Sequence, residues 1–271
     1  MKILKIIGLL CLFCFTFIYT EKIINVSIEQ DEIMIKIKEY TNNHNIDPIN
    51  AIINEDTIIP GNIGKYIDTE SSYKKMKKYG YFSETNLIYK DIYPEISIYN
   101  NYNKYIIKGN TNNKSISLIY ILNNNNTINN IINIINKYNI PINFFIDSTY
   151  LTNNISIIDT IKNNEIYNYG NNGNYTKDNL IIANNIINNK SNNSSIYCLF
   201  LEKNNNSLNN CADNKMLSII PSLNTNYQNI KNNLNNGSII LIDNTKQLSS
   251  IIEYIISKGY KIVPLSNLIT E

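Results

Sequence analysis

The chain has 271 residues, of which 43% are hydrophobic and 17% charged. This is enough for one sizeable core and a small additional module, but not for several large domains. Its 24 basic and 22 acidic side chains give a net charge of +2, so the charge balance gives no sign of a nucleic-acid-binding surface. Asparagine is abundant, but it alternates with isoleucine at helix and strand spacing, which indicates surface positions of a folded domain.

The N-terminus resembles an export segment. Lys2 and Lys5 precede an apolar run over residues 6–19, which ends at Thr20 and Glu21. Basic residues before such a run predict that the following chain is exported, so residues 1–20 are a signal anchor or a signal peptide. Because bulky residues stand where cleavage requires small ones, an uncleaved membrane anchor is favoured. The protein is therefore predicted to be extracytoplasmic and held to the membrane by this segment; secretion is the alternative.

The next two segments are less regular. Residues 21–46 form a predicted stalk, in which DEIMIKIKEY alternates as a strand does, although its flanking charges also suit a helix. Residues 47–112 form a predicted accessory region. It has a turn at residues 60–62, a helix in SSYKKMKKYG that ends at Gly80, and extended pieces at residues 88–93 and 105–107.

From residue 113 to residue 271 the pattern becomes a regular alternation of strands and helices. The helix in TINNIINIINKYN has isoleucines on one face, and the helix in QLSSIIEYIISKGY ends at Gly259. Strands are predicted at residues 115–122, 142–147, 165–169, 195–201, 216–221, 238–243 and 261–264. Seven such units predict an α/β domain, and a small distorted (β/α)7 barrel is favoured over an open sheet.

Two cysteines lie within this domain. In an oxidising compartment Cys198 and Cys211 could form a disulfide, and two buried free thiols are the alternative. Two cysteines alone are too few for a zinc site.

Three segments of this domain resemble a known family in sequence and in order. They are KSISLIYILNNNNTINNIINIINKYNIPINFFID, then KNNEIYNYGNNGNYTKDNL, then GSIILIDNTKQLSSIIEYIISKGYKIVPLSNLI. Together they resemble the polysaccharide deacetylase domain, also called the NodB-homology domain or carbohydrate esterase family 4. The region ahead of it, with IPGNIG, SYKKMKK and KYIIKGN, is similar to the accessory region of some membrane-anchored bacterial members.

The resemblance implies a distorted barrel and the removal of acetyl groups from chitin, peptidoglycan or xylan. In the family a divalent metal, held by one aspartate and two histidines, activates a water molecule beside a second aspartate that acts as base. The family motif Thr-Phe-Asp-Asp-Gly falls on residues 119–123, where Ile121 and Leu122 replace the two aspartates. The two metal-binding histidines fall on Tyr169 and Gly173, and the catalytic histidine falls on Asp243.

Composition supports this loss of catalytic groups. The family's arginine-proline motif falls near residues 197–202, but the chain contains no arginine. Its one histidine, His44, lies in the predicted stalk. We therefore predict no catalytic residues, no metal ligands and no cofactor. A divalent metal in a rebuilt site is the alternative, and it would draw on Asp147, Glu165, Cys198 and Asp243.

A barrel without its metal retains a groove at the carboxyl ends of its strands, where a polysaccharide could bind. The predicted groove residues are Tyr120, Asn123, Glu165, Tyr169 and Asp243, and Tyr167 is expected nearby. The predicted function is an inactive deacetylase-like protein that acts on or binds cell-envelope glycan. The alternatives are an active deacetylase with a rebuilt site and a structural interaction module of the envelope.

Overall fold

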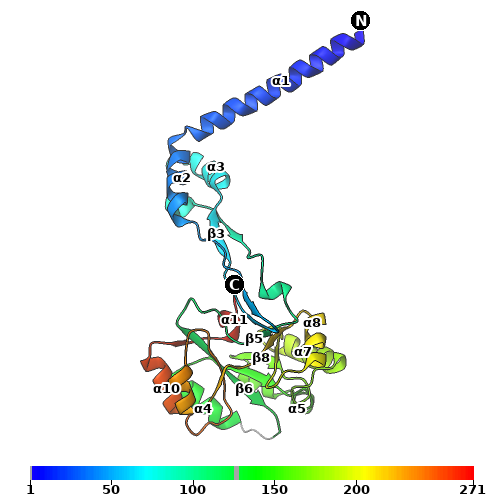
Figure 1. Ribbon diagram of the computed structural model, residues 1–271, viewed down its shortest axis with the longest axis vertical. Helices are drawn as coiled ribbons and strands as arrows, with labels where there is room; N and C mark the ends of the chain where they lie inside the picture. The colour runs from blue at the N-terminus through cyan, green and yellow to red at the C-terminus, as the bar shows by residue number, and fades with distance from the viewer. Residues whose placement is uncertain (1, 125–127) are drawn as a thin grey trace. The chain divides into compact units, whose positions relative to one another are not determined.

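The computed structural model describes residues 2–124 and 128–271, and no description is given of the side chains of residues 2–6, 8, 9 and 11. The described chain forms two compact units, shown as ribbons in Figure 1. Unit 1 comprises residues 1–48 and 63–93, and unit 2 comprises residues 49–62 and 94–271.

Unit 1 is a small helical module with one β-hairpin. Its elements are α1 (Lys2–Glu29), α2 (Glu32–His44), β3 (Gly64–Ile67), α3 (Thr69–Lys77), η1 (Glu84–Asn86) and β4 (Tyr89–Ile92). Strands β3 and β4 pair antiparallel. The helix predicted before Gly80 is α3, and Gly80 follows it with a φ of +78°, a conformation that glycine adopts without a steric penalty.

The segment DEIMIKIKEY is a helix. Asp31 caps α2 by accepting a hydrogen bond of 3.0 Å from the Ile33 backbone N–H, and Lys36 pairs with Glu32 one turn earlier. Ile33 and Ile37 are buried against α3, whereas Ile35 is 44% exposed. The strand-like alternation was therefore misleading, because the buried side chains follow the helical period.

The N-terminal run lies in α1, and Met1 is outside the described residues. Among the residues that the structure describes, no helix is long and apolar enough to cross a membrane. The predicted membrane anchor is thus not supported.

Unit 2 is an α/β domain, which confirms the predicted class. Its six-stranded parallel sheet has the order β11 (Leu223–Asn224), β12 (Ile239–Leu241), β6 (Ser115–Leu122), β7 (Asn143–Ile146) and β8 (Glu165–Asn168), with β13 (Lys261–Ile262) also paired to β6. Its five-stranded sheet has the order β1 (Ile52–Asn54), β2 (Thr57–Ile59), β5 (Tyr105–Ile106), β10 (Leu217–Ile219) and β9 (Tyr197–Leu199).

Each of the seven strands predicted for the barrel is present, but they are divided between these two sheets. Between β8 and β9 side chains replace the backbone ladder. The Asn193 amide accepts from the Ile166 N–H and donates to the Ile166 carbonyl, both at 2.9 Å, and the Ser195 hydroxyl accepts from the Asn168 N–H at 3.0 Å. Asparagine can substitute for a neighbouring strand in this way because its side chain is itself an amide.

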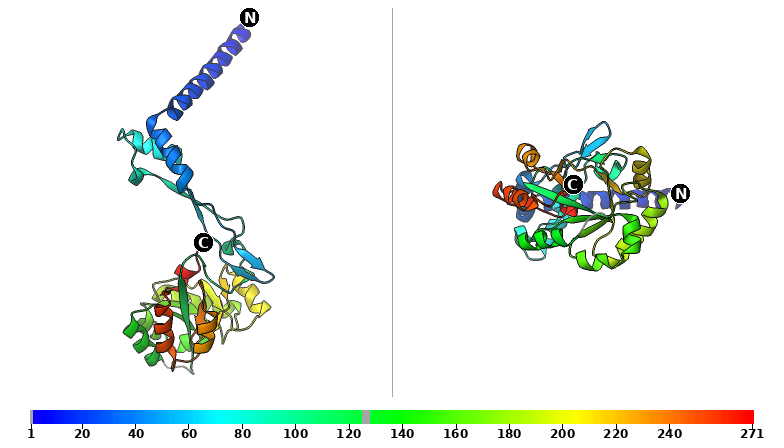
Figure 2. Two further views of the ribbon diagram at one scale, coloured as in Figure 1. Left: turned by 60° about the vertical axis from the view of Figure 1, so that its left-hand side comes forward. Right: turned by 90° about the horizontal axis from the view of Figure 1, so that it is seen from below.

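Helices surround the strands of unit 2, as the right-hand view of Figure 2 shows. They are η2 (Ile98–Asn100), α4 (Ile128–Tyr138), α5 (Ser148–Asn153), α6 (Ile157–Ile161), α7 (Lys177–Lys190), α8 (Asn205–Asp213), α9 (Tyr227–Asn233), α10 (Leu248–Ser257) and α11 (Leu265–Leu268). The predicted start of α4 at Thr127 lies outside the described residues.

The central strand β6 is apolar because both of its faces are covered. Leu118 and Leu122 belong to the core beneath the helices, while Ile119 and Ile121 pack on the other face with residues of the five-stranded sheet. Each fully buried isoleucine or leucine contributes roughly 1.5–3 kcal/mol to folding. This explains why the sequence reads as a continuous apolar run.

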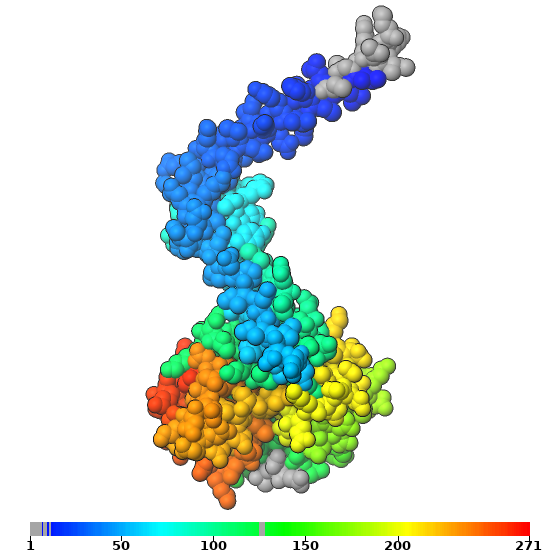
Figure 3. Space-filling view, in the orientation of Figure 1, coloured from blue at the N-terminus to red at the C-terminus, as the bar shows by residue number. Residues whose placement is uncertain are grey.

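Part of the predicted accessory region belongs to unit 2. Residues 49–62 supply β1 and β2, and β2 pairs in parallel with β5. In Figure 3 the blue residues near position 50 lie on the surface of unit 2 beside much later parts of the chain. The compact units therefore do not follow the predicted boundary between residues 112 and 113.

Candidate functional site

A cavity of about 400 Å³ lies at the carboxyl ends of β6, β8, β9 and β12. We call it the central cavity. Because neighbouring parallel strands end at the same sheet edge, residues far apart in the sequence meet there. It is lined by Tyr120, Ile121, Asn123, Tyr169, Asn172, Leu201, Leu241, Ile242, Asp243, Asn244 and Thr245.

The structure brings together four of the five predicted groove residues, namely Tyr120, Asn123, Tyr169 and Asp243. Glu165 lies elsewhere, at the opposite end of β8. There its carboxylate accepts hydrogen bonds from the Tyr167 hydroxyl (2.7 Å) and the Ser266 N–H (3.1 Å). The prediction for Glu165 was wrong because the residue begins the strand instead of ending it.

Tyr167 also lies outside the cavity. It is 1% exposed and packs against Phe145 and Tyr197, with ring centroids 5.2 and 4.9 Å away. Burial raises its pKa, and the nearby Glu165 carboxylate adds to this effect. It is therefore a core residue.

The two positions of the family's aspartate pair have different surroundings. Leu122 is fully buried in the core, whereas Ile121 is half-buried and lines the central cavity. One of these two positions thus holds a core side chain, and the other presents a hydrocarbon side chain to the cavity.

Tyr169 and Gly173, which stand at the positions of the family's metal-binding histidines, lie next to each other, and the small residue leaves room for the large one. Gly173 has a φ of +81°, and a Cβ at this position would lie 3.1 Å from the Tyr169 hydroxyl oxygen. The Tyr169 ring therefore occupies the space that a side chain at position 173 would need. Burial raises the pKa of Tyr169, and the Asp147 carboxylate adds to this, so the phenol remains neutral.

These residues do not fit the divalent metal of the family. Two hydrocarbon side chains, a neutral phenol and a glycine offer no anionic or imidazole ligand. The residues considered for a rebuilt site do not converge either. Cys198 is in a disulfide, and Glu165 is at the other end of its strand. Across residues 2–124 and 128–271 no group of three histidine, cysteine, aspartate or glutamate residues is placed to hold a metal.

Asp147 is not part of the cavity lining but is hydrogen-bonded to the backbone of Asn172, which is. It is 7% exposed and follows β7, where one carboxylate oxygen accepts hydrogen bonds of 2.9 Å from the Thr149 and Tyr150 N–H groups and so caps α5. Its other oxygen accepts a 2.7 Å hydrogen bond from the Asn172 N–H. This contact fixes the turn that joins Tyr169 to Gly173.

Two further cavities adjoin the central one. The second shares Tyr169, Asn172 and Leu201 with it and extends along residues 202–204. The third shares Leu201 and Leu241 and extends along residues 221–224. Leu201, which is 49% exposed, lines all three, so they form one groove across the strand ends.

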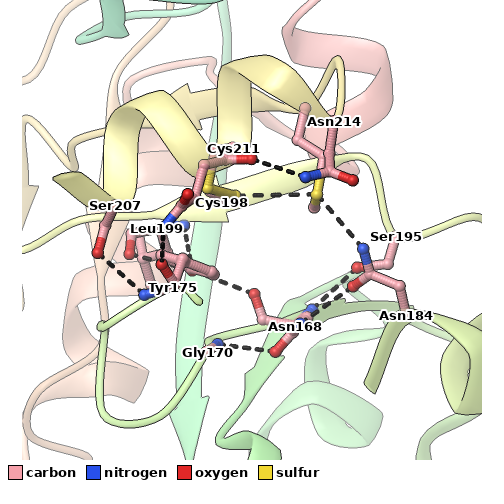
Figure 4. The surroundings of a disulfide bond; sticks show 12 residues. Asn168, Gly170, Tyr175, Asn184, Ser195, Cys198, Leu199, Ser207, Cys211 and Asn214 are labelled. Carbon is pink, nitrogen blue, oxygen red and sulfur yellow. Dashed lines mark hydrogen bonds between the residues drawn. A yellow bond between two sulfur atoms is a disulfide. The ribbon is translucent and has the colours of Figure 1, made fainter. Parts of the chain in front are cut away.

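A disulfide anchors one rim of this groove. Cys198 in β9 is bonded to Cys211 in α8, so of the two alternatives from the sequence the structure has the disulfide (Figure 4). The bond closes the loop that contains residues 200–204 of the rim. Both cysteines are completely buried.

Sequence reasoning missed several lining residues, including Asn172, Leu201, Asn244 and Thr245. Leu201 is the last residue of one predicted strand, and Asn244 and Thr245 directly follow another. The rule that parallel strands end at one edge would have selected them.

Known proteins that share this fold are family 4 carbohydrate esterases. A pseudoenzyme of that family from Bacillus anthracis has a TM-score of 0.63, with 22% sequence identity, over 88% of this chain and 95% of its own. A peptidoglycan N-acetylglucosamine deacetylase has a TM-score of 0.53, with 18% identity, over 62% of this chain and 94% of its own. The chain thus has the family 4 carbohydrate esterase fold, and the resemblance predicted from the sequence is confirmed at the level of the fold.

Sequence comparison gives one curated relative. The Bacillus subtilis (strain 168) protein YlxY is 26% identical over 136 residues, which are 49% of this chain and 43% of YlxY. The match therefore spans less than half the length of that relative. No protein-family model matches the chain.

Proposed function

We propose that this protein binds a polysaccharide of the cell envelope without hydrolysing it. The observation that carries the proposal is the central cavity, which keeps the position of a strand-end active site but is lined by hydrocarbon, phenol, amide and hydroxyl groups. Relatives by fold include both an active peptidoglycan deacetylase and a pseudoenzyme.

The composition of the groove suits a sugar chain. Sugars present apolar C–H faces and many hydroxyl groups, so they need flat or branched apolar contacts beside hydrogen-bonding side chains. Ile121, Leu201 and Leu241 supply the apolar wall. Asn123, Asn172, Asn244 and Thr245 supply amide and hydroxyl groups. The adjoining cavities add length, which a polymer would use and a small molecule would not.

The chemistry of the lining supports the proposed absence of hydrolysis. Acetyl transfer to water needs a base to take a proton and a cation or donors to stabilise the developing negative charge. Ile121 and Leu122 offer neither, and burial keeps Tyr120 and Tyr169 protonated by raising the pKa of each. Asp243 is the remaining carboxylate in the cavity lining.

We further propose that the protein acts outside the cytoplasm. The Cys198–Cys211 disulfide supports this, because such bonds persist in oxidising compartments. The apolar side chains at the N-terminus also support export. In α1, Leu12, Phe13 and Phe15 are 65%, 69% and 72% exposed.

The test is co-sedimentation of the purified protein with insoluble peptidoglycan and with chitin, together with an acetate assay. We expect binding and no acetate. Leu201→Ala should weaken binding about fivefold, because about 1 kcal/mol of apolar contact is lost. Ile256→Ala is the matched control, since Ile256 is also 49% exposed but lies on α10, away from the groove. The proposal fails if neither polymer retains the protein. It also fails if Leu201→Ala binds the polymers as tightly as Ile256→Ala does.

A further inference from the structure

Asp243 is the one charged side chain among the described residues that line the central cavity. It lies two residues after the end of β12 and is exposed at the cavity wall. The other lining groups are neutral at physiological pH. The cavity therefore carries a single negative charge.

The carboxylate is held by a buried threonine. Thr225, which is 4% exposed, donates its hydroxyl hydrogen to Oδ1 of Asp243. The same hydroxyl oxygen accepts hydrogen bonds from the backbone N–H groups of Asp243 (3.2 Å) and Asn244 (3.0 Å). Because these two N–H groups occupy the acceptor side of the hydroxyl, its hydrogen points to the carboxylate. Asp243 is thus oriented by its own strand end and by the segment after β11.

Among the described residues, this carboxylate has no cationic partner. In the part of the chain that the structure describes, the ion pairs of unit 2 do not include Asp243, and Oδ2 accepts no hydrogen bond. The chain as a whole carries a net charge of +2, so a general attraction for cations is not expected. A cation that binds here would do so because of the local carboxylate.

We propose that the central cavity selects a deacetylated amino sugar, that is, a sugar unit that carries a free ammonium group in place of an N-acetyl group. This inference rests on the proposed function, because it assumes that the groove binds a polysaccharide. An ammonium group offers three donors and a full positive charge to Oδ2 of Asp243, and charge-assisted hydrogen bonds are about twice as strong as neutral ones. An N-acetyl group would instead place a neutral amide and a methyl group beside the carboxylate and remove water from it without compensation.

The experiment is calorimetric titration of the full chain with tetramers of glucosamine and of N-acetylglucosamine at about pH 6, where carboxylates are ionised and amines protonated. We expect the glucosamine tetramer to bind at least about tenfold more tightly. Asp243→Asn should reduce this preference to within about twofold, mainly by weakening binding of the glucosamine tetramer. The variant retains an oxygen that accepts from Thr225, so the local fold is kept. Asp159→Asn is the control, since Asp159 is an exposed aspartate on α6, outside the cavity.

The outcomes separate this inference from the proposed function. If both tetramers bind equally, or if Asp243→Asn keeps the preference, the inference is overturned and polysaccharide binding stands. If neither tetramer binds and the polymers of the co-sedimentation test do not retain the protein, the proposed function and the inference both fail. A preference that Asp159→Asn abolishes as well would show a general charge effect and would also overturn the inference.

Discussion

Replacing Tyr175 by phenylalanine removes one oxygen atom from the interior of unit 2. Tyr175 is 1% exposed, and burial raises its pKa well above the ordinary value, so its hydroxyl is always protonated. This hydroxyl accepts a 2.7 Å hydrogen bond from the Leu199 N–H. Its hydrogen is shared between the carbonyl oxygens of Asn168 (3.1 Å) and Leu199 (3.2 Å). The contacts surround Tyr175 in Figure 4 and connect β8 with β9, between which there is no backbone ladder.

The expected cost follows from these contacts. The phenylalanine ring keeps the packing, so no large cavity forms. The variant loses two hydrogen bonds worth about 0.5–1.5 kcal/mol each. It also leaves the Leu199 N–H buried without an acceptor. An unsatisfied buried group costs about 1–3 kcal/mol, and the hydrogen-bond values above already include part of this cost. Tyr175→Phe should therefore lower the free energy of unfolding by about 2–4 kcal/mol.

The assay is urea denaturation followed by far-ultraviolet circular dichroism, with hydrogen exchange of the Leu199 amide as a local readout. The denaturation midpoint should fall with an unchanged slope, and Leu199 should exchange faster in the variant. Tyr99→Phe is the control, because Tyr99 is also in unit 2 but is 45% exposed. If the two variants differ by less than about 0.5 kcal/mol, the hydroxyl of Tyr175 does not hold β8 and β9 together as argued.

Three further predictions concern single contacts. Asp147→Ala removes the acceptor of three backbone N–H groups and should cost about 2 kcal/mol in urea denaturation and also weaken polysaccharide binding; unchanged stability would contradict its role. The double variant Cys198→Ala with Cys211→Ala opens a loop with a sequence separation of 13 and should cost about 3 kcal/mol, which a thermal melt equal to that of the native protein would disprove. In unit 1 the pKa of Asp68 is lowered, most strongly by the Lys90 ammonium and less by the N–H and hydroxyl groups of Ser71. The ionised Asp68 carboxylate therefore stabilises the folded state fully above pH ~4, and this stabilisation is lost as pH falls through the lowered pKa. Asp68→Asn should therefore destabilise unit 1 at neutral pH and progressively less below pH ~4, and a pH-independent difference would refute this.

Much of unit 2 could be predicted because its strands are buried on both faces. The apolar run of β6 was predicted to the residue, at Ser115–Leu122. The end of α10 was predicted from Gly259, whose φ is +77°. Such signals are local: a run of apolar residues or a glycine at a helix end acts in the same way whatever surrounds it.

The division into two sheets depends on contacts that are distant in the sequence. Residues 49–62 carry no signal that they join β5, since the partner lies more than 40 residues away. The side-chain hydrogen bonds of Asn193 to Ile166 are equally hidden, because asparagine in this chain is common at the surface. Sequence patterns cannot distinguish an asparagine that replaces a strand from one that faces solvent.

Four of the five predicted groove residues line the cavity, because their positions near strand ends can be predicted from the sequence. Tyr120, Asn123, Tyr169 and Asp243 lie within two residues of the carboxyl ends of strands, and parallel strands bring such positions together. Glu165 was misplaced because it stands at the start of its strand. The complementarity between Tyr169 and Gly173 could not be foreseen, because it depends on a positive φ and a distance across the turn.

The central claim is that the groove does not hydrolyse acetylated polysaccharide, although the chain has the fold of a family of hydrolases. The most direct test is acetate release from acetylated chitin oligomers and peptidoglycan by the full chain supplied with divalent metal, with an active family 4 carbohydrate esterase as positive control. The account predicts no acetate above the rate without protein. Acetate release that a chelator abolishes would contradict it.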